Sequence, residues 1–295
     1  MKAAIIDIGS NSIRYMEGET KNGHILSAGG KLLYTTRLAA GLDRSGLLSL
    51  PSMEASIKVL RELALQAESH GLCAFAYATS AVRSAKNREE FLAQVRAETG
   101  LCVDVIEGER EGELARLGAG GELMDIGGGS AQLSTAEKSI SYPAGCVRGR
   151  DLLQGKLAGA SPEIQCAAVA EWVERLVKDA GIAPRDFPAG VTWAGAGGTI
   201  TTLAALSLGL ARYERERVQG AELTRDSVWA LIHALYNMGE RRREHPLLTK
   251  RHDVILPGAY ILMYLLSELP SPRHLATDAD GMEGYLLSLA TNEAK

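Results

Sequence analysis

The sequence predicts an α/β protein built from two similar halves. The chain has 295 residues, which is enough for two domains of ordinary size. Apolar runs typical of buried strands alternate along it with segments that have helical spacing. In addition, the phrase IIDIGSNS at 5–12 returns in shortened form as MDIGGGS at 124–130. Two copies of one phrase, each opening a half, indicate a duplicated architecture.

The first half opens with strands. Residues 2–8 form an apolar run that stops at a glycine, which predicts a buried strand. Further strands are expected at 12–17 and 24–34, with a hairpin turn at 21–23. The rest of this half alternates, with helices expected at 52–70, 86–98 and 109–118 and strands at 72–79 and 102–107.

The same pattern then starts again. A strand at 122–126 ends in the second Asp-Ile-Gly, and a hairpin is expected at 132–135 and 139–142. A strand at 190–195 runs into a glycine-rich turn and a helix at 199–208. The remaining elements are helices at 147–157, 162–180, 224–238, 258–268 and 281–291 and a strand near 273–277.

The glycine-rich stretch 118–121 is the natural boundary between the halves, because glycine adopts backbone angles that other residues resist. We therefore expect an N-terminal domain at 1–118 and a C-terminal domain at 119–295. The final helix, about 281–295, is expected to be able to pack back on the first domain.

Composition limits the classes of function. Apolar residues make up 46% and charged residues 23% of the chain, as in globular proteins. The net charge of −4 argues against a nucleic-acid partner, although a local basic pocket for an anion is compatible with it. No apolar run is long enough for a membrane helix or a signal peptide, so we expect no membrane partner. The four cysteines lack metal spacing and are expected to be free thiols in a reducing cytoplasm.

Each repeated phrase places an aspartate at the end of a strand, before a turn of small residues. Backbone N–H groups in such a turn can point together and cradle a phosphate. Asp7 and Asp125 repel phosphate themselves, but each can hold a hydrated Mg²⁺ that bridges to phosphate oxygens. A third turn precedes a helix, whose N-terminus favours anions. The candidate phosphate-binding residues of the three turns are Ser10, Asn11, Ser12, Gly127, Gly128, Gly129, Ser130, Gly197, Gly198 and Thr199.

Plainer interpretations remain open at this point. A single Asp-Gly turn is common and binds nothing in most proteins. Glu111 stands in a run of charges and Arg83 is a lone arginine, so both are typical of solvated surface. The basic clusters Arg212–Arg217 and Arg241–Arg243 fit a track for an anionic chain or, again, ordinary surface.

Taken together, the motifs resemble the Ppx/GppA phosphatase family of exopolyphosphatases and guanosine pentaphosphate phosphohydrolases. The resemblance covers nearly the whole chain. It rests on the motifs at 7–12, 78–87, 107–112, 125–130 and 195–199, and more weakly on those at 219–224, 251–258 and 280–284. It implies two actin-like, ribonuclease H-like ATPase-type domains around a hinge and an interdomain cleft.

The resemblance also implies roles for particular residues. Glu111 matches the glutamate that activates the attacking water, and Asp125 matches the carboxylate beside the metal and the phosphate. Asp7 matches the carboxylate of the first loop, and Arg83 an arginine that faces the substrate phosphates. The implied activity is Mg²⁺-dependent release of the terminal phosphate from inorganic polyphosphate or guanosine pentaphosphate, with a homodimer as the plausible assembly.

Three departures from the family pattern bear on activity. Ala131-Gln132-Leu133 stands where the family usually has Thr-Glu-Leu, so one negative charge near the metal is missing. Met282 stands where an arginine often precedes Glu-Gly. Arg110 interrupts a run of acids beside Glu111. Two alternatives to a hydrolase therefore stay open: a non-catalytic sensor of polyphosphate or an alarmone, and a nucleotide-using kinase or ATPase of the same superfamily.

Overall fold

The structure is a computed structural model that describes residues 1–292. The chain divides into two compact units, Met1–Gly118 with Ala279–Lys295, and Ala119–Asp278. The division after Gly118 lies where the sequence placed the boundary. The expected C-terminal domain, 119–295, extends beyond the second unit, which ends at Asp278, because the final helix packs with the first unit.

The first unit contains a mixed sheet with the order β3-β2-β1-β5-β6, and β4 pairs with β2. Strand β1 is antiparallel to β2 and parallel to β5. The expected single strand at 24–34 is wrong, because Gly29-Gly30 separate β3 from β4. The strands are β1 (Lys2–Ile8), β2 (Ser12–Lys21), β3 (His24–Ala28), β4 (Leu32–Thr35), β5 (Cys73–Ala78) and β6 (Val103–Val105).

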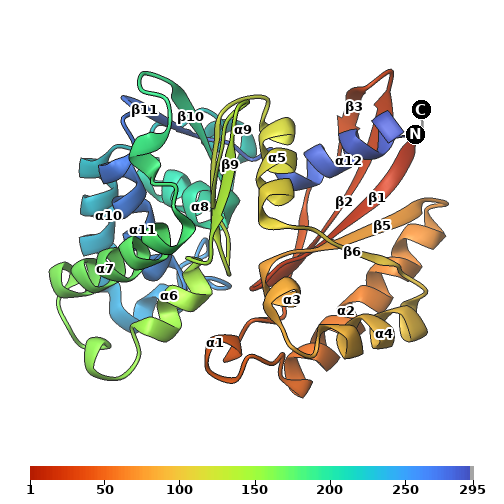
Figure 1. Ribbon diagram of the computed structural model, residues 1–295, viewed down its shortest axis with the longest axis horizontal. Coiled ribbons are helices and arrows are strands. Elements are labelled where there is room, and N and C mark those ends of the chain that lie inside the picture. The colour runs from red at the N-terminus through yellow and green to blue at the C-terminus, as the bar shows by residue number, and fades with distance from the viewer. Residues whose placement is uncertain (293–295) are drawn as a thin grey trace. The chain divides into compact units, whose positions relative to one another are not determined.

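Helices cover this sheet, with α2 and α4 on one face and α12 on the other (Figure 1). Helix α2 begins where Ser49 accepts a hydrogen bond from the Ser52 amide and Pro51 occupies the first turn, where a proline is tolerated. The short helix α3 was not expected. The helices are α1 (Leu42–Ser45), α2 (Leu50–Ser69), α3 (Ser80–Ser84), α4 (Arg88–Thr99), α5 (Gly108–Ala119) and α12 (Gly281–Asn292).

The second unit repeats the topology of the first. Its sheet has the order β11-β10-β7-β8-β9, with an antiparallel meander on one side of β7 and parallel strands on the other. Both sheets therefore share one order, which confirms the duplicated actin-like, ribonuclease H-like fold. The strands are β7 (Leu123–Ile126), β8 (Ala131–Ser134), β9 (Ser139–Tyr142), β10 (Thr192–Ala196) and β11 (Arg273–Ala276).

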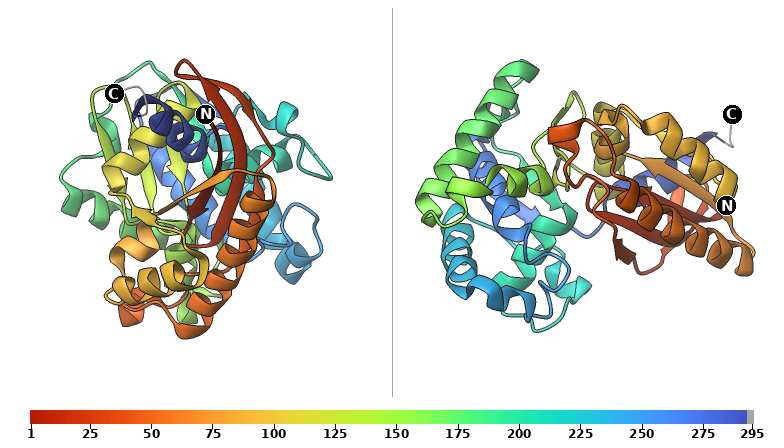
Figure 2. Two further views of the ribbon diagram at one scale, coloured as in Figure 1. Left: turned by 90° about the vertical axis from the view of Figure 1, so that its right-hand side faces the viewer. Right: turned by 90° about the horizontal axis from the view of Figure 1, so that it is seen from below.

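Helices α7, α8, α10 and α11 gather on one face of this second sheet (Figures 1 and 2). They enclose a large hydrophobic core, with Trp193 fully buried in it. The expected helix 147–157 stops early, because Gly155 has a positive φ and the chain continues as a 3₁₀ turn. The helices are α6 (Cys146–Leu152), α7 (Pro162–Ala180), α8 (Gly197–Ser207), α9 (Arg215–Val218), α10 (Arg225–Met238) and α11 (Ile255–Glu268), with 3₁₀ turns η1 (Gly155–Leu157), η2 (Pro184–Asp186) and η3 (Gly239–Arg243).

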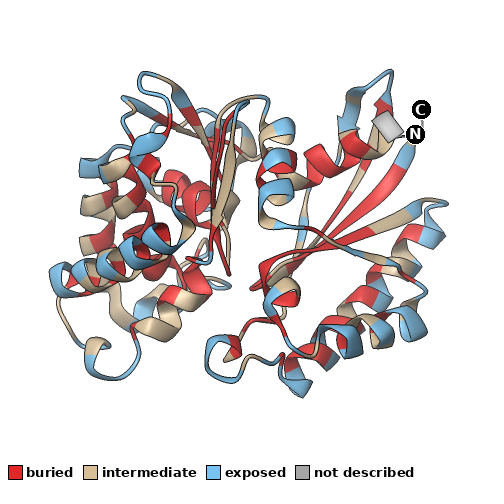
Figure 3. Cartoon of the chain, viewed as in Figure 1, coloured by how far each residue is buried: buried red, intermediate tan, exposed pale blue. Residues whose placement is uncertain are grey.

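Burial follows these layers. Strand β1 is buried from Ala3 onward and α11 along most of its length, whereas α2 and α4 alternate between buried and exposed residues (Figure 3). Within the described part of the chain, no helix is both long and apolar enough to cross a membrane. The four cysteines are free thiols.

Candidate functional site

The turn between β1 and β2 forms the first candidate phosphate loop. The Gly9 amide donates to the Ser12 carbonyl at 3.1 Å, which closes the turn. Amides of Arg37 and Ala39 donate to the carbonyls of Asn11 and Ser10, each at 2.9 Å, and hold the loop from outside. The buried Ser10 hydroxyl has no hydrogen-bond partner among the residues described. This loop therefore has a fixed backbone and an unused donor.

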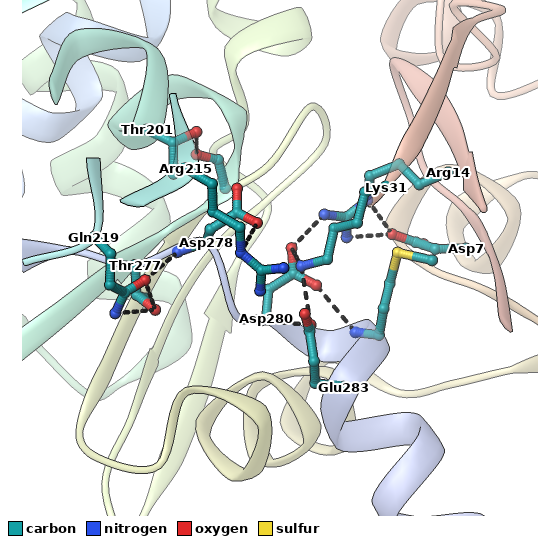
Figure 4. Close-up of polar contacts among 12 residues, drawn as sticks. Asp7, Arg14, Lys31, Thr201, Arg215, Gln219, Thr277, Asp278, Asp280 and Glu283 are labelled. Atoms are coloured by element: carbon teal, nitrogen blue, oxygen red, sulfur yellow. Dashed lines mark hydrogen bonds and ion pairs between the residues drawn. The ribbon is translucent and has the colours of Figure 1, made fainter. Parts of the chain in front are cut away.

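Asp7 lies beside this loop in an ion-pair network. The Arg14 guanidinium donates to Asp7 Oδ2 through Nε, at 2.8 Å, and through Nη2, and its Nη1 pairs with Asp280 (Figure 4). The other carboxylate oxygen of Asp7 is buried and has no hydrogen-bond partner within the described chain. Burial raises the pKa of the Asp7 carboxyl, against the opposing attraction of Arg14. Arg14 thus binds one oxygen of the Asp7 carboxylate, and the other oxygen is left for a ligand.

Hydrogen bonds that cap the start of α12 complete the network. Asp280 Oδ1 accepts from the Met282 amide and Glu283 Oε2 accepts from the Asp280 amide, each at 3.0 Å. Lys31 bridges both carboxylates, at 3.1 Å from Asp280 and 2.9 Å from Glu283. Burial alone would raise the pKa of Asp280, but Arg14 and Lys31 hold it well below its usual range. The negative charge that anchors Arg14 beside Asp7 is therefore permanent near neutral pH.

Glu111 and Arg83 also meet within the first unit. Glu111 lies in the first turn of α5 and Arg83 in the last turn of α3. Arg83 Nη1 donates to the Ile106 carbonyl at 2.7 Å and to Glu111 Oε2 at 3.2 Å. Both side chains are half-buried, so the ion pair orients the Glu111 carboxylate more firmly than a surface pair would. Neither residue is the fully solvated surface residue of the plainer interpretation.

The second candidate loop, after β7, repeats the first in atomic detail. The Gly127 amide donates to the Ser130 carbonyl at 2.9 Å, as Gly9 does to Ser12. The first amides of α6, Cys146 and Val147, donate to the Gly127 and Gly128 carbonyls at 3.0 and 2.8 Å. These bonds turn the loop carbonyls toward α6, which leaves the opposite side of the loop to its N–H groups.

The third glycine turn, where β10 ends and α8 begins, lies against the second loop. Gly197 has a φ of +85°, and a Cβ on it would overlap Asp125 Oδ1 and lie 2.8 Å from the Ile126 carbonyl oxygen. A Cβ on Gly198 would overlap the Arg251 guanidinium. The Thr199 side chain packs against Gly258, where a Cβ would overlap it. The glycines are thus required for close approach, and they place Arg251 and Asp125 at one glycine turn.

Gln132 lies directly opposite Asp125 in the antiparallel pair of β7 and β8. Its buried amide nitrogen donates to Ser130 Oγ at 2.7 Å and to Ser141 Oγ at 3.4 Å. Since Ser130 Oγ accepts from Gln132, its own O–H is left to donate elsewhere. A glutamate here would instead accept from that hydroxyl and bring a second carboxylate beside Asp125.

The second departure, Met282, is fully buried in a cluster with Ile5, Met16 and Leu114. Its side chain contributes to the core of the first unit. Arg110, the third departure, is exposed and pairs with Glu113 at 3.2 Å, so its charge is directed away from Glu111.

The predicted site residues therefore fall into two groups, one in each unit. The first holds Asp7, Ser10, Asn11, Ser12, Arg83 and Glu111, and the second holds Asp125, Gly127, Gly128, Gly129, Ser130, Gly197, Gly198 and Thr199. Sequence reasoning gave no role to Arg14, Lys31, Asp280, Glu283 or Arg251. Asp280, Glu283 and Arg251 stand in the weak family motifs at 251–258 and 280–284, and these motifs could have pointed to them. Nothing in the local sequence marks Lys31.

Fold and site together define an actin-like protein whose glycine-serine loops and adjacent carboxylates suit phosphate chemistry. A model of the Ppx/GppA phosphatase family matches residues 19–293, and the chain belongs to that family. Exopolyphosphatase 2 of Mycobacterium tuberculosis is 29% identical over 98% of both chains.

Solved structures agree with this membership. A crystal structure of the Aquifex aeolicus member of the family superimposes with a TM-score of 0.78 at 30% identity, covering 100% of this chain and 99% of that one. An exopolyphosphatase-like protein superimposes with a TM-score of 0.87 at 23% identity, over 100% and 99% of the two chains, and shows the shared fold.

Proposed function

We propose that this protein is an exopolyphosphatase, which hydrolyses the terminal phosphoanhydride bond of inorganic polyphosphate. The observation that carries the proposal is the Glu111–Arg83 pair, a half-buried carboxylate held by an arginine in a unit that also carries a phosphate loop. Family membership and the exopolyphosphatase relatives support the substrate.

In this mechanism Glu111 orients a water molecule toward the terminal phosphorus and takes up its proton as the new P–O bond forms. The anhydride P–O bond breaks, and the shortened chain leaves with the negative charge. Phosphoryl transfer of this kind depends on positioning and charge neutralisation more than on covalent chemistry. The contacts described for Arg83 are made by Nη1, so its other guanidinium N–H groups can bind a phosphate oxygen.

Asp7 in the first unit and Asp125 in the second are each a carboxylate that would bind Mg²⁺. Among residues 1–292, no three His, Cys, Asp or Glu side chains group closely enough to cage a metal by themselves. This fits Mg²⁺, which binds through one or two carboxylates, with phosphate oxygens and water as its other ligands. The unpartnered, buried oxygen of Asp7 is one such ligand. When bound, the ion would neutralise charge on the phosphate chain.

Guanosine pentaphosphate is a second substrate that the same loops could accept, since both substrates present a terminal phosphoanhydride. A homodimer in the cytoplasm is the assembly and location we propose with this activity.

The test is phosphate release from long-chain polyphosphate with Mg²⁺, with guanosine pentaphosphate in parallel. We expect Glu111→Gln to lower kcat by roughly 10²–10⁴-fold. Glu109→Gln, an exposed neighbour on the same helix, is the matched control and should keep wild-type kcat. Wild-type protein that binds polyphosphate but releases no phosphate would refute the enzyme and favour a sensor. Melting-temperature shifts with ADP but not with polyphosphate would favour the kinase or ATPase.

A further inference from the structure

Positive charge is concentrated in one part of the second unit. Segments 146–157 and 239–253 together carry eight Lys or Arg and four Asp or Glu, whereas the whole chain has 32 basic and 36 acidic residues. The segments are neighbours in space, because Arg150 Nη1 pairs with Asp253 Oδ2 at 3.1 Å. We call these two segments the basic surface.

The inner end of the basic surface meets the third glycine turn. The Arg251 guanidinium lies against Gly198 there. Two residues further along the chain, Asp253 forms an ion pair with Arg150. Asp253 also attracts Arg242. Burial lowers the pKa of Arg242, and the negative charges of Glu240 and Asp253 oppose that shift. Asp253 thus pairs with Arg150 and attracts Arg242, two residues along the chain from Arg251 at the turn.

The outer end of the basic surface is solvent-exposed. Arg241, Arg243 and Lys250 are all exposed. Arg243 pairs with Glu240 at 3.1 Å, but both side chains are more than 60% exposed, so this pair contributes little and a polyanion can displace it. The segment 239–253 therefore carries basic residues both at the glycine turn and at exposed positions.

The composition of the basic surface distinguishes between polyanions. Proteins that bind single-stranded nucleic acid combine basic grooves with aromatic side chains on which bases stack. The two segments contain no Phe, Tyr or Trp. A chain of phosphates without bases needs only the charges.

We propose that the basic surface binds the phosphates of a long inorganic polyphosphate chain that lie beyond the terminal, cleaved residues. The proposal deepens the proposed function and rests on it for the identity of the chain. The surface makes long polyphosphate a tighter ligand than tripolyphosphate, because a long chain can contact more of its basic residues at once.

The test is equilibrium binding of labelled long-chain polyphosphate and of tripolyphosphate. It is measured without Mg²⁺, so that the ligand is not hydrolysed during the measurement. The variant is Arg241→Gln/Arg243→Gln/Lys250→Gln. The matched control, Arg212→Gln/Arg215→Gln/Arg217→Gln, removes the same charge from the other basic cluster of the unit.

For the variant we expect a roughly tenfold weaker Kd for the long chain and an unchanged Kd for tripolyphosphate. The slope of log Kd against log salt concentration should become shallower by about 2, because the three lost phosphate contacts no longer release counterions on binding. The control should stay within about twofold of wild type. Equal weakening in both triple variants, or none in either, would overturn the assignment.

Activity separates this proposal from the proposed function. If the wild type binds long chains through the basic surface but releases no phosphate, the enzyme proposal fails and this one stands. If it releases phosphate and the variant keeps the wild-type Kd for long chains, this proposal fails and the enzyme stands.

Discussion

Two adjacent glycines at the start of α8, Gly197 and Gly198, should respond very differently to alanine. A Cβ on Gly198 meets the Arg251 guanidinium, the far end of a flexible side chain, and Gly198 has no positive φ. The backbone can stay in place while Arg251 moves away, so stability should remain within about 1 kcal/mol of wild type. We expect Arg251, which lies at this glycine turn, to donate a hydrogen bond to a substrate phosphate. Loss of one such charged hydrogen bond costs about 1.5–3 kcal/mol, which is roughly a ten- to 150-fold fall in kcat/KM.

Gly197→Ala has the opposite profile. Its φ of +85° strains any L side chain by about 1–2 kcal/mol. The new Cβ also meets Asp125 and a backbone carbonyl, neither of which can retreat freely, so we expect a total loss of about 2–4 kcal/mol of stability.

The assay for this pair combines urea unfolding with phosphate-release kinetics. Arg251→Gln should reproduce the kinetic loss of Gly198→Ala, and the double variant should lose little more, since both changes remove one contact. A Gly198→Ala protein that unfolds like Gly197→Ala, or that keeps wild-type kcat/KM while Arg251→Gln does not, would refute this reasoning.

Three further changes test other parts of the structure. Gln132→Glu places a second buried carboxylate opposite Asp125, so we expect a lower melting temperature without Mg²⁺ that added Mg²⁺ restores; equal melting with and without the ion would contradict this. Lys31→Met leaves two buried carboxylates short of a partner and should cost about 3 kcal/mol in urea unfolding, against less than about 1 kcal/mol for the exposed control Lys2→Met. Burial lowers the pKa of His274, so the unfolded chain takes up a proton at this histidine before the folded protein does, and the fold loses stability as the pH falls through the usual histidine range. The stability of His274→Gln should therefore fall less than that of the wild type between neutral and mildly acidic pH. Parallel curves of stability against pH would contradict this.

Much of the fold could be predicted because two local signals coincide. The repeated phrase marks the first strand of each sheet, and hydrophobic periodicity marks the long helices such as α2 and α7. Short elements escaped prediction, since α3 has five residues and depends on its packing rather than on periodicity. The split of 24–34 into two strands follows from Gly29-Gly30, which a pattern of apolar residues does not reveal.

From the residues alone, the candidate site was predictable only where its members are adjacent in sequence, whereas Arg83 and Glu111 came from the family resemblance. The loops around Asp7 and Asp125 each form within a few residues and could be recognised locally. The network of Arg14, Lys31 and Asp280 joins positions up to 266 apart, and only folding brings them together. Arg251 stood in a weak motif but received no role for the same reason, because its neighbour Gly198 lies far away in the sequence.

An exopolyphosphatase directs water at the terminal phosphorus of a polyphosphate chain. The most direct measurement is turnover of long-chain polyphosphate with Mg²⁺ in water enriched in heavy oxygen, followed by mass analysis of the products. We predict one heavy oxygen in each orthophosphate released by the wild type and almost no release by Glu111→Gln. Release of chain fragments in place of orthophosphate, orthophosphate without the label, or full release by Glu111→Gln would contradict the account.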